Sequence, residues 1–151
     1  MDTAALARIL ARLLETQRWG VLATRGPWAA HVAFAPWRGG LLLHLSTLAA
    51  HTRHLLADPA AALAVGEADD GRTDPQTLAR ATLRGRVAPV EAAARAAAGQ
   101  AYLARFPAAA PRFAFTDFAL YRLEAEEARV VAGLGAAGSL RGEVLRRALA
   151  P

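Results

Sequence analysis

Apolar side chains recur at intervals of three and four positions near the N-terminus. They are Leu6, Ile9, Leu10, Leu13 and Leu14. This spacing places them along one side of a helix, with Arg8, Arg12 and Glu15 on the other side. Asp2 or Thr3 precedes the first leucine and is suited to cap the helix. The pattern predicts an amphipathic helix that packs on another part of the chain.

From Trp19 the pattern changes to the two-residue period of strands. Residues 19–24, 28–36 and 41–46 are each typical of a strand, and His31 and Val32 must lie on opposite faces of the second. Short connections that contain Gly separate these segments. They therefore predict an antiparallel meander of three strands.

The rest of the chain alternates between the two patterns. The predicted helices are 48–57, 89–105 and 139–149, and the predicted strands are 61–66, 78–90, 118–123 and 128–132. Gly85 is expected to bend its strand, and the acidic segment 67–75 is expected to be a solvated loop. About six strands in this order predict a mainly β fold of the α+β class: a six-stranded antiparallel barrel with peripheral helices, in one domain over residues 1–151.

Composition narrows the classes of function. Among 151 residues there are 40 Ala and no Cys, so the core must come from larger apolar residues, and disulfides, zinc thiolates and cysteine nucleophiles are excluded. All 18 basic residues are Arg, but they are spread along the chain among 13 acids, which favours a solvated surface with one local anion site over a nucleic-acid interface. The apolar runs are too short to span a membrane, and no secretory signal is evident, so we expect a cytoplasmic protein.

Residues 43–55 carry the clearest candidate chemistry. A predicted strand leads into a short helix here, and the junction holds Ser46, Thr47, His51, Thr52 and Arg53. Backbone amides at a helix start, hydroxyls and a guanidinium together favour an anion such as phosphate. In a simpler alternative, Ser46 and Thr47 only cap the helix while His51 and Arg53 face solvent. His51 and His54 are three residues apart, but no carboxylate at helical spacing completes a metal site, so we expect none.

The string Leu43-His44-Leu45-Ser46-Thr47-Leu48-Ala49-Ala50-His51-Thr52-Arg53-His54-Leu55 supports a more specific interpretation. It resembles the phosphate-binding helix of the pyridoxamine 5'-phosphate oxidase-like FMN-binding split barrels, most closely the branch related to haem utilisation. That pattern is roughly L-S-x-L-A-x-H-T-x-N-L followed by D-P. Five other segments resemble the family in the same order: residues 20–24, 79–85, 102–108, 117–123 and 131–137.

The resemblance implies a split barrel that binds FMN at the interface of a homodimer. It assigns the FMN phosphate to Ser46, Thr47, His51 and Thr52, with Arg53 as a further candidate. It places the isoalloxazine along His31, Val32 and Ala33, and Arg80 or Thr82 near the flavin from the dimer side. The chain departs from the pattern at two polar positions in particular, where Ala30 replaces Ser and His54 replaces Asn.

The first functional hypothesis is therefore an FMN-binding protein, a flavin-dependent oxidoreductase acting on a small molecule. No residue stands out as a catalytic acid or base, and the absence of G-x-S-x-G disfavours a hydrolase. One alternative is a haem-binding or haem-degrading split barrel, in which His31 or His44 is an axial ligand instead of an ordinary hydrogen-bonded histidine. Another is a non-catalytic flavin carrier, or a barrel without a ligand that acts through protein contacts.

Overall fold

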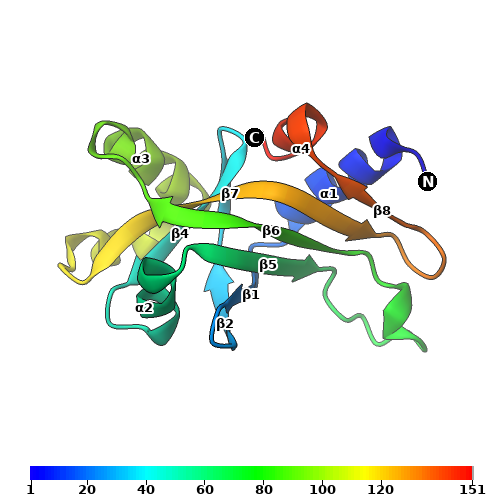
Figure 1. Cartoon of the computed structure of the whole chain (residues 1–151), viewed down its shortest axis with the longest axis horizontal. Coiled ribbons are helices and arrows are strands. Elements are labelled where there is room, and N and C mark those ends of the chain that lie inside the picture. Colours follow the sequence, from blue (N-terminus) through cyan, green and yellow to red (C-terminus); the bar gives the residue numbers. More distant parts are fainter. Residues whose placement is uncertain (151) are drawn as a thin grey trace.

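The computed structural model describes residues 1–150. Over these residues the α-helices are α1 (Thr3–Thr16), α2 (Ala50–Ala57), α3 (Arg95–Arg105) and α4 (Gly142–Ala148). The strands are β1 (Trp19–Thr24), β2 (Trp28–Ala33), β3 (Ala35–Trp37), β4 (Gly40–Ser46), β5 (Ala60–Gly66), β6 (Arg80–Pro89), β7 (Phe118–Val131) and β8 (Ala137–Leu140) (Figure 1). Short 3-10 helices occupy the connections: η1 (Pro75–Thr77), η2 (Ala92–Ala94) and η3 (Pro107–Ala114). No helix within residues 1–150 has the length and apolar character needed to cross a membrane.

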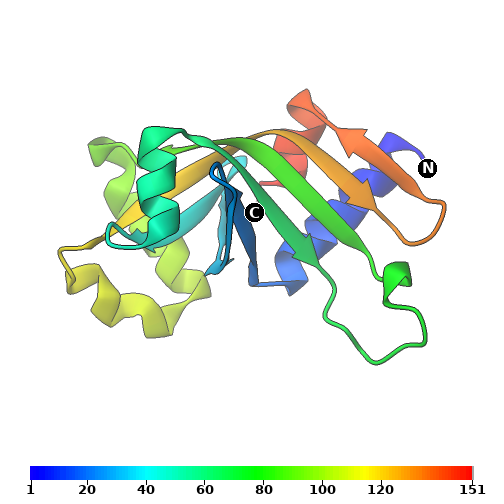
Figure 2. The same ribbon diagram turned by 60° about the horizontal axis from the view of Figure 1, so that its bottom comes forward.

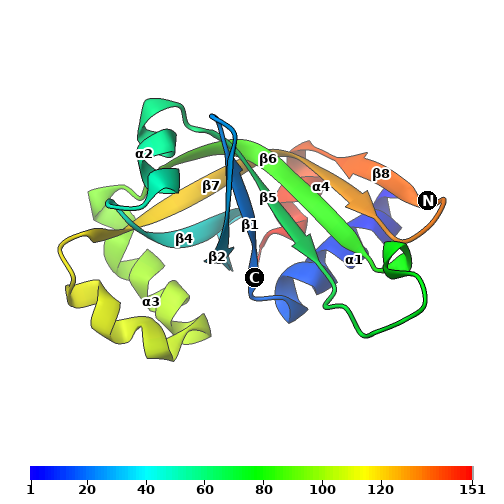
Figure 3. The same ribbon diagram turned by 90° about the horizontal axis from the view of Figure 1, so that it is seen from below.

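The strands form one antiparallel sheet in the order β2-β1-β5-β6-β7-β4-β3, with β8 also paired to β7. The sheet curls into a half-barrel with helices around it, so the predicted α+β split barrel with peripheral helices is confirmed, with eight strands where six were expected. α1 and α4 lie at the β8 end of the sheet, and α3 and η3 lie at the opposite end (Figures 1 and 3). α2 also lies at that opposite end, apart from α3 (Figure 2).

The strands differ from the prediction at three places: β3 and β8 are additional, and two predicted strands are one. β8 includes the first two residues of the predicted helix 139–149. The predicted strand 28–36 breaks at Phe34, whose ring is fully buried, and the chain passes there from the β2 edge of the sheet to the β3 edge. The predicted strands 118–123 and 128–132 are one continuous strand, β7, because its first half pairs with β4 while its last residues pair with β8. The prediction of two separate strands there was therefore wrong.

Local signals in the sequence performed better at two places. Asp2 accepts a hydrogen bond from the backbone N of Ala5 at 2.7 Å and caps α1, as predicted. The bend expected at Gly85 is a register shift between Arg84 and Gly85 against β7. A Cβ at Gly85 would overlap the carbonyl of Glu124, so only Gly allows the strands to approach this closely.

The core has two compartments. Inside the curl, the leucines of α1 pack with Leu22, Leu63, Leu83 and Leu123 from four strands. Outside it, Trp37, Leu42 and Tyr102 form a second cluster between β3, β4 and α3. β4 therefore buries both of its faces, which explains its almost unbroken run of leucines.

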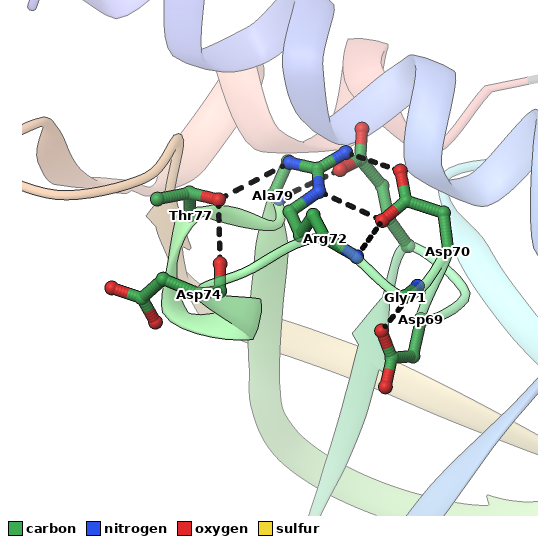
Figure 4. Close-up of polar contacts among 8 residues, drawn as sticks. Asp69, Asp70, Gly71, Arg72, Asp74, Thr77 and Ala79 are labelled. Carbon is green, nitrogen blue, oxygen red and sulfur yellow. Dashed lines mark hydrogen bonds and ion pairs between the residues drawn. The ribbon is translucent and has the colours of Figure 1, made fainter.

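The acidic loop between β5 and β6 is organised by one guanidinium (Figure 4). Arg72 pairs with both carboxylate oxygens of Asp70, at 2.9 and 2.8 Å, and donates to Oγ1 of Thr77 at 3.3 Å. These hydrogen bonds hold the pKa of Asp70 at about 2. The negative charge of Asp70 is thus already paired with Arg72 within the loop, and both side chains remain exposed. The structure supports the predicted solvated connection.

Candidate functional site

Hydrogen bonds from Ser46 and Thr47 join the end of β4 to Asp117, the residue before β7. The Ser46 hydroxyl donates to Oδ2 of Asp117 at 2.9 Å, and the backbone N of Thr47 donates to the Asp117 carbonyl at 2.6 Å. α2 begins only at Ala50, and its N-cap position has no side-chain hydrogen bond. The expectation that Ser46 or Thr47 caps this helix was therefore wrong, because Ser46 is drawn to a carboxylate 71 positions away.

The other residues of the predicted phosphate site point in different directions. Thr52 is fully buried, and its Oγ1 has no hydrogen-bond partner within residues 1–150. Arg53 is exposed and turns back to donate to the carbonyl of Leu48 at 3.0 Å. His51 is half-buried, and its pKa is lowered by burial and by the neighbouring His54. His51, Thr52 and Arg53 are consecutive residues of α2, but their side chains do not converge on one point. Their role in phosphate binding stays a prediction.

His54, one of the departures from the family pattern, has the better-defined position. Its Nδ1 lies 3.1 Å from Oγ1 of Thr24, and its ring meets Trp28 edge-on with centroids 6.0 Å apart. The backbone of Gly26 lies beside the same ring, where a Cβ would sit 3.7 Å from Cε1. His54 thus fastens α2 to the β1–β2 turn, a structural role that the chain spacing alone did not reveal.

The remaining predicted residues gather on the outward face of the sheet. Strand register pairs Val21 with both His31 and Ala64, Ala64 with Thr82, and Thr82 with Arg129. Side chains that are paired across strands share a face, so these five residues form one row across β2, β1, β5, β6 and β7. The adjacent Leu22, Leu63 and Leu83 are fully buried on the opposite face. We call the row from His31 to Arg129 the outward row.

His31 marks one end of the outward row. Its exposed ring stacks on Trp19, with centroids 4.6 Å apart and planes inclined by 19°. Ala33 lies opposite Trp19 on the same face, whereas the Val32 side chain faces the core and is 6% exposed. The structure therefore brings His31, Ala33 and Thr82 onto one face and separates the Val32 side chain from them.

Arginines lie at the other end of the outward row. Arg80, Thr82 and Arg129 line a hollow of about 340 Å³ together with Val21 and Ala64. Arg80 is held by the carbonyls of Gln76 and Leu78, at 2.9 and 3.1 Å. A second hollow of about 680 Å³ lies further along the sheet, between the β1–β2 turn and β6.

The second hollow, like the first, is lined by small side chains and arginines. Its floor contains Ala23 and Ala62, and its border contains Arg84 and Arg86. Arg84 is paired with Glu127 at 2.6 Å, and hydrogen bonds to Glu127 from Arg84, Ser139 and Arg141 lower the pKa of that carboxyl to about 2. The hollow thus combines a floor of small side chains with charged residues: Glu126, Arg84, which is paired with Glu127, and Arg86, which forms no ion pair within residues 1–150.

No three His, Asp or Glu side chains gather closely enough in residues 1–150 to hold a metal ion by themselves. The outward face instead offers an imidazole on an indole, a shallow floor and several guanidiniums. Such a surface is suited to a flat molecule with negative groups at one edge. The alanines of this floor were not singled out in the sequence, because only the register between β1 and β5 brings them together.

Comparison with known proteins identifies relatives of this chain. The chloroplastic haem oxygenase HOZ of Arabidopsis thaliana is 36% identical over 105 residues, which cover 70% of this chain and 31% of that protein. The structure of a haem-binding protein from Mycobacterium smegmatis is similar with a TM-score of 0.84 and 31% identity, over 94% of this chain and 60% of that one. This chain thus spans less than two thirds of either relative.

Two further findings bear on the fold and the family. HutZ, the haem storage protein of Vibrio cholerae, shares the fold with a TM-score of 0.69 at 17% identity, over 90% of this chain and 94% of that one. The names of HOZ and the mycobacterial protein mention haem and neither mentions a flavin, so they do not support FMN. The family described as CREG, beta-barrel, matches residues 1–144. That match fits the expected split-barrel resemblance at a coarse level, and this chain belongs to the CREG beta-barrel family.

Proposed function

We propose that this chain binds haem on the outward face of its sheet. The observation that carries the proposal is the outward row, which has an imidazole stacked on an indole at one end and a guanidinium at the other. HOZ and the mycobacterial protein, both more than 30% identical to this chain, support haem as the ligand. This is the alternative function that the sequence offered beside FMN.

The residues of the outward face suit haem. Haem is a flat apolar ring with an iron that imidazole commonly binds and two carboxylates at one edge. His31 would provide the imidazole, and the small side chains of Ala62 and Ala64 would let the ring approach the sheet. Arg86 and Arg129, neither of which forms an ion pair within residues 1–150, would hold the carboxylates. Bound haem supplies the redox-active iron, while the chain's own residues bind and orient it.

A second copy of the chain would complete this site. The Trp19 side chain remains 60% exposed beside the outward row, and the alanine floor is open on one side. Surfaces of this kind favour association, and the homodimer expected from the family resemblance would cover this one. We therefore propose a dimer through the outward face. Light scattering with and without haem tests it, and a monomer under both conditions would contradict it.

Absorbance titration tests the ligand. Haem added to the protein should give a saturable Soret shift, whereas FMN in excess should give no bound flavin spectrum. Because the chain contains only four histidines, each can be replaced singly by Ala. His31→Ala should weaken haem binding at least about tenfold, as expected for loss of a ligating group. His51→Ala is the matched control. Unchanged haem affinity in His31→Ala would contradict the assignment of the ligand.

A further inference from the structure

A separate cavity of about 600 Å³ lies on the outside of the sheet, beneath α3. It is bounded by β4, β7 and α3, with Phe113 and Phe118 in its wall. His44 reaches it because residues alternate along β4: Leu43 and Leu45 enter the core inside the barrel, and His44 takes the opposite face. The cavity is distinct from the outward row, which crosses β2, β1, β5 and β6 and reaches β7 only at Arg129, whereas the cavity is lined by Phe118, Ala119 and Leu120 at the start of β7.

The wall of the cavity is built to receive an aromatic ring. The imidazole of His44 stacks on Phe113, with centroids 4.1 Å apart and planes inclined by 22°. Phe118 and Tyr102 approach the same imidazole at 5.2 and 5.6 Å. Aromatic groups prefer such stacked and tilted neighbours over aliphatic ones of equal area. A flat ring would extend this cluster into the open space.

His44 also has unused hydrogen-bonding capacity. Its Nδ1 is enclosed and has no partner within residues 1–150. Burial, helped by the charge of Arg112, lowers the pKa of His44 to about 4, so the ring is neutral at pH 7. An enclosed polar atom without a partner is unfavourable, and native proteins seldom leave one. Because Nδ1 is shut off from the cavity, a bound molecule would reach the other ring nitrogen, Nε2, which also makes no hydrogen bond within residues 1–150.

The arginines at the cavity indicate that a molecule bound there carries a negative group. Arg95 lines the cavity from α3, and Arg112 lies close enough to influence His44. Neither guanidinium forms an ion pair with another residue of the described chain, 1–150. Guanidinium groups bind carboxylates with paired hydrogen bonds. An aromatic molecule with a carboxylate would therefore satisfy both the wall and the entrance.

We propose that this cavity binds a small planar aromatic carboxylate bearing a hydroxyl group. Its ring packs against Phe113 and Phe118, and its carboxylate pairs with Arg95. Its hydroxyl, which both donates and accepts, bonds to Nε2 of His44 in either tautomer. The volume lies within the range of small-molecule pockets. This site is independent of haem and does not require the second subunit.

Calorimetric titration with 4-hydroxybenzoate tests the proposal. Saturable binding is expected, with cyclohexanecarboxylate at least about tenfold weaker because it lacks the flat ring. His44→Leu and Arg95→Gln should each reduce the affinity about tenfold. Arg8→Gln, an exposed arginine on α1, is the matched control for the charge change.

Gly99→Leu provides a variant that keeps both polar partners. Gly99 lines the cavity, and a Cβ there would make only an ordinary 3.4 Å contact with Phe113. The longer side chain should fill the space and abolish binding while the protein stays folded. No saturable binding by the unmodified chain would overturn the proposal. Equal affinity in His44→Leu, Arg95→Gln and Gly99→Leu would do so as well.

Discussion

The outside of the sheet is bare over β1, β5 and β6 but covered over β4 by α3 and η3. On the bare part the outward-facing residues are small or cationic, such as Ala64 and Arg80. On the covered part they are Leu42 and His44, packed against aromatic rings. The same surface of one sheet thus provides an uncovered site for a large flat ligand and a site partly covered by α3 and η3 for a small one. What covers each strand decides which ligand it fits.

Filling the uncovered site should have the largest effect on haem. Ala64→Trp places a bulky side chain in the middle of the outward row, so haem affinity should fall about 100-fold. The exposed Ala92, in η2, gives the matched control Ala92→Trp. Parallel titrations with 4-hydroxybenzoate should show no change in either variant. If Ala64→Trp weakened both ligands equally, the two sites would not be independent.

Removing the support of His31 should have a smaller effect. Trp19→Ala leaves His31 in place but without its stacked partner, and such pairs contribute about 1 kcal/mol. Haem affinity should fall about fivefold, as measured from the Soret titration. Trp28 is also exposed but contacts His54, so Trp28→Ala should bind haem like the parent chain. Equal losses in the two variants would argue against His31.

The partly covered site should appear in the pH dependence of stability. Between pH 6.5 and 4, the unfolded state protonates His44 while the folded state does not, because burial lowers the pKa of His44 to about 4. The free energy of unfolding should therefore be fully retained above pH 6.5 and fall by about 1 kcal/mol as the pH approaches 4. Urea titrations of the parent chain and His44→Phe measure this. Identical pH profiles would contradict a buried neutral imidazole.

The smallest expected effect concerns the charged end of the outward row. Arg129→Gln should reduce haem affinity about twofold to threefold, because exposed ion pairs contribute little and are screened by salt. Haem dimethyl ester, which lacks the free carboxylates, should bind the parent chain and Arg129→Gln equally. A greater loss with the ester than with haem would place the carboxylates elsewhere.

The sequence predicted those features that depend on neighbouring residues. Strands were predicted at 19–24, 41–46 and 78–90, which match β1, β4 and β6, and Gly85 was recognised as the bend of its strand. Two strands were expected over 118–123 and 128–132, yet β7 is continuous, and Glu127 within it accepts hydrogen bonds across the sheet from Arg84.

Features set by distant pairing could not be predicted in this way. The bond from Ser46 to Asp117 joins positions 71 residues apart, and no local pattern encodes it. The union of His31 with Thr82 on one face depends on the register of four successive strands. The histidines and arginines were therefore recognised as candidates, but their grouping into two sites required the fold.

Paramagnetic broadening of the histidine side-chain NMR signals tests the central claim most directly. Ferric haem broadens nuclei close to its iron, and the four histidines serve as reporters in different parts of the molecule. The account predicts that haem abolishes the ring signals of His31, while those of His44 beneath α3 stay sharp. Loss of the His44 signals with His31 unaffected would contradict it and place haem in the cavity beneath α3.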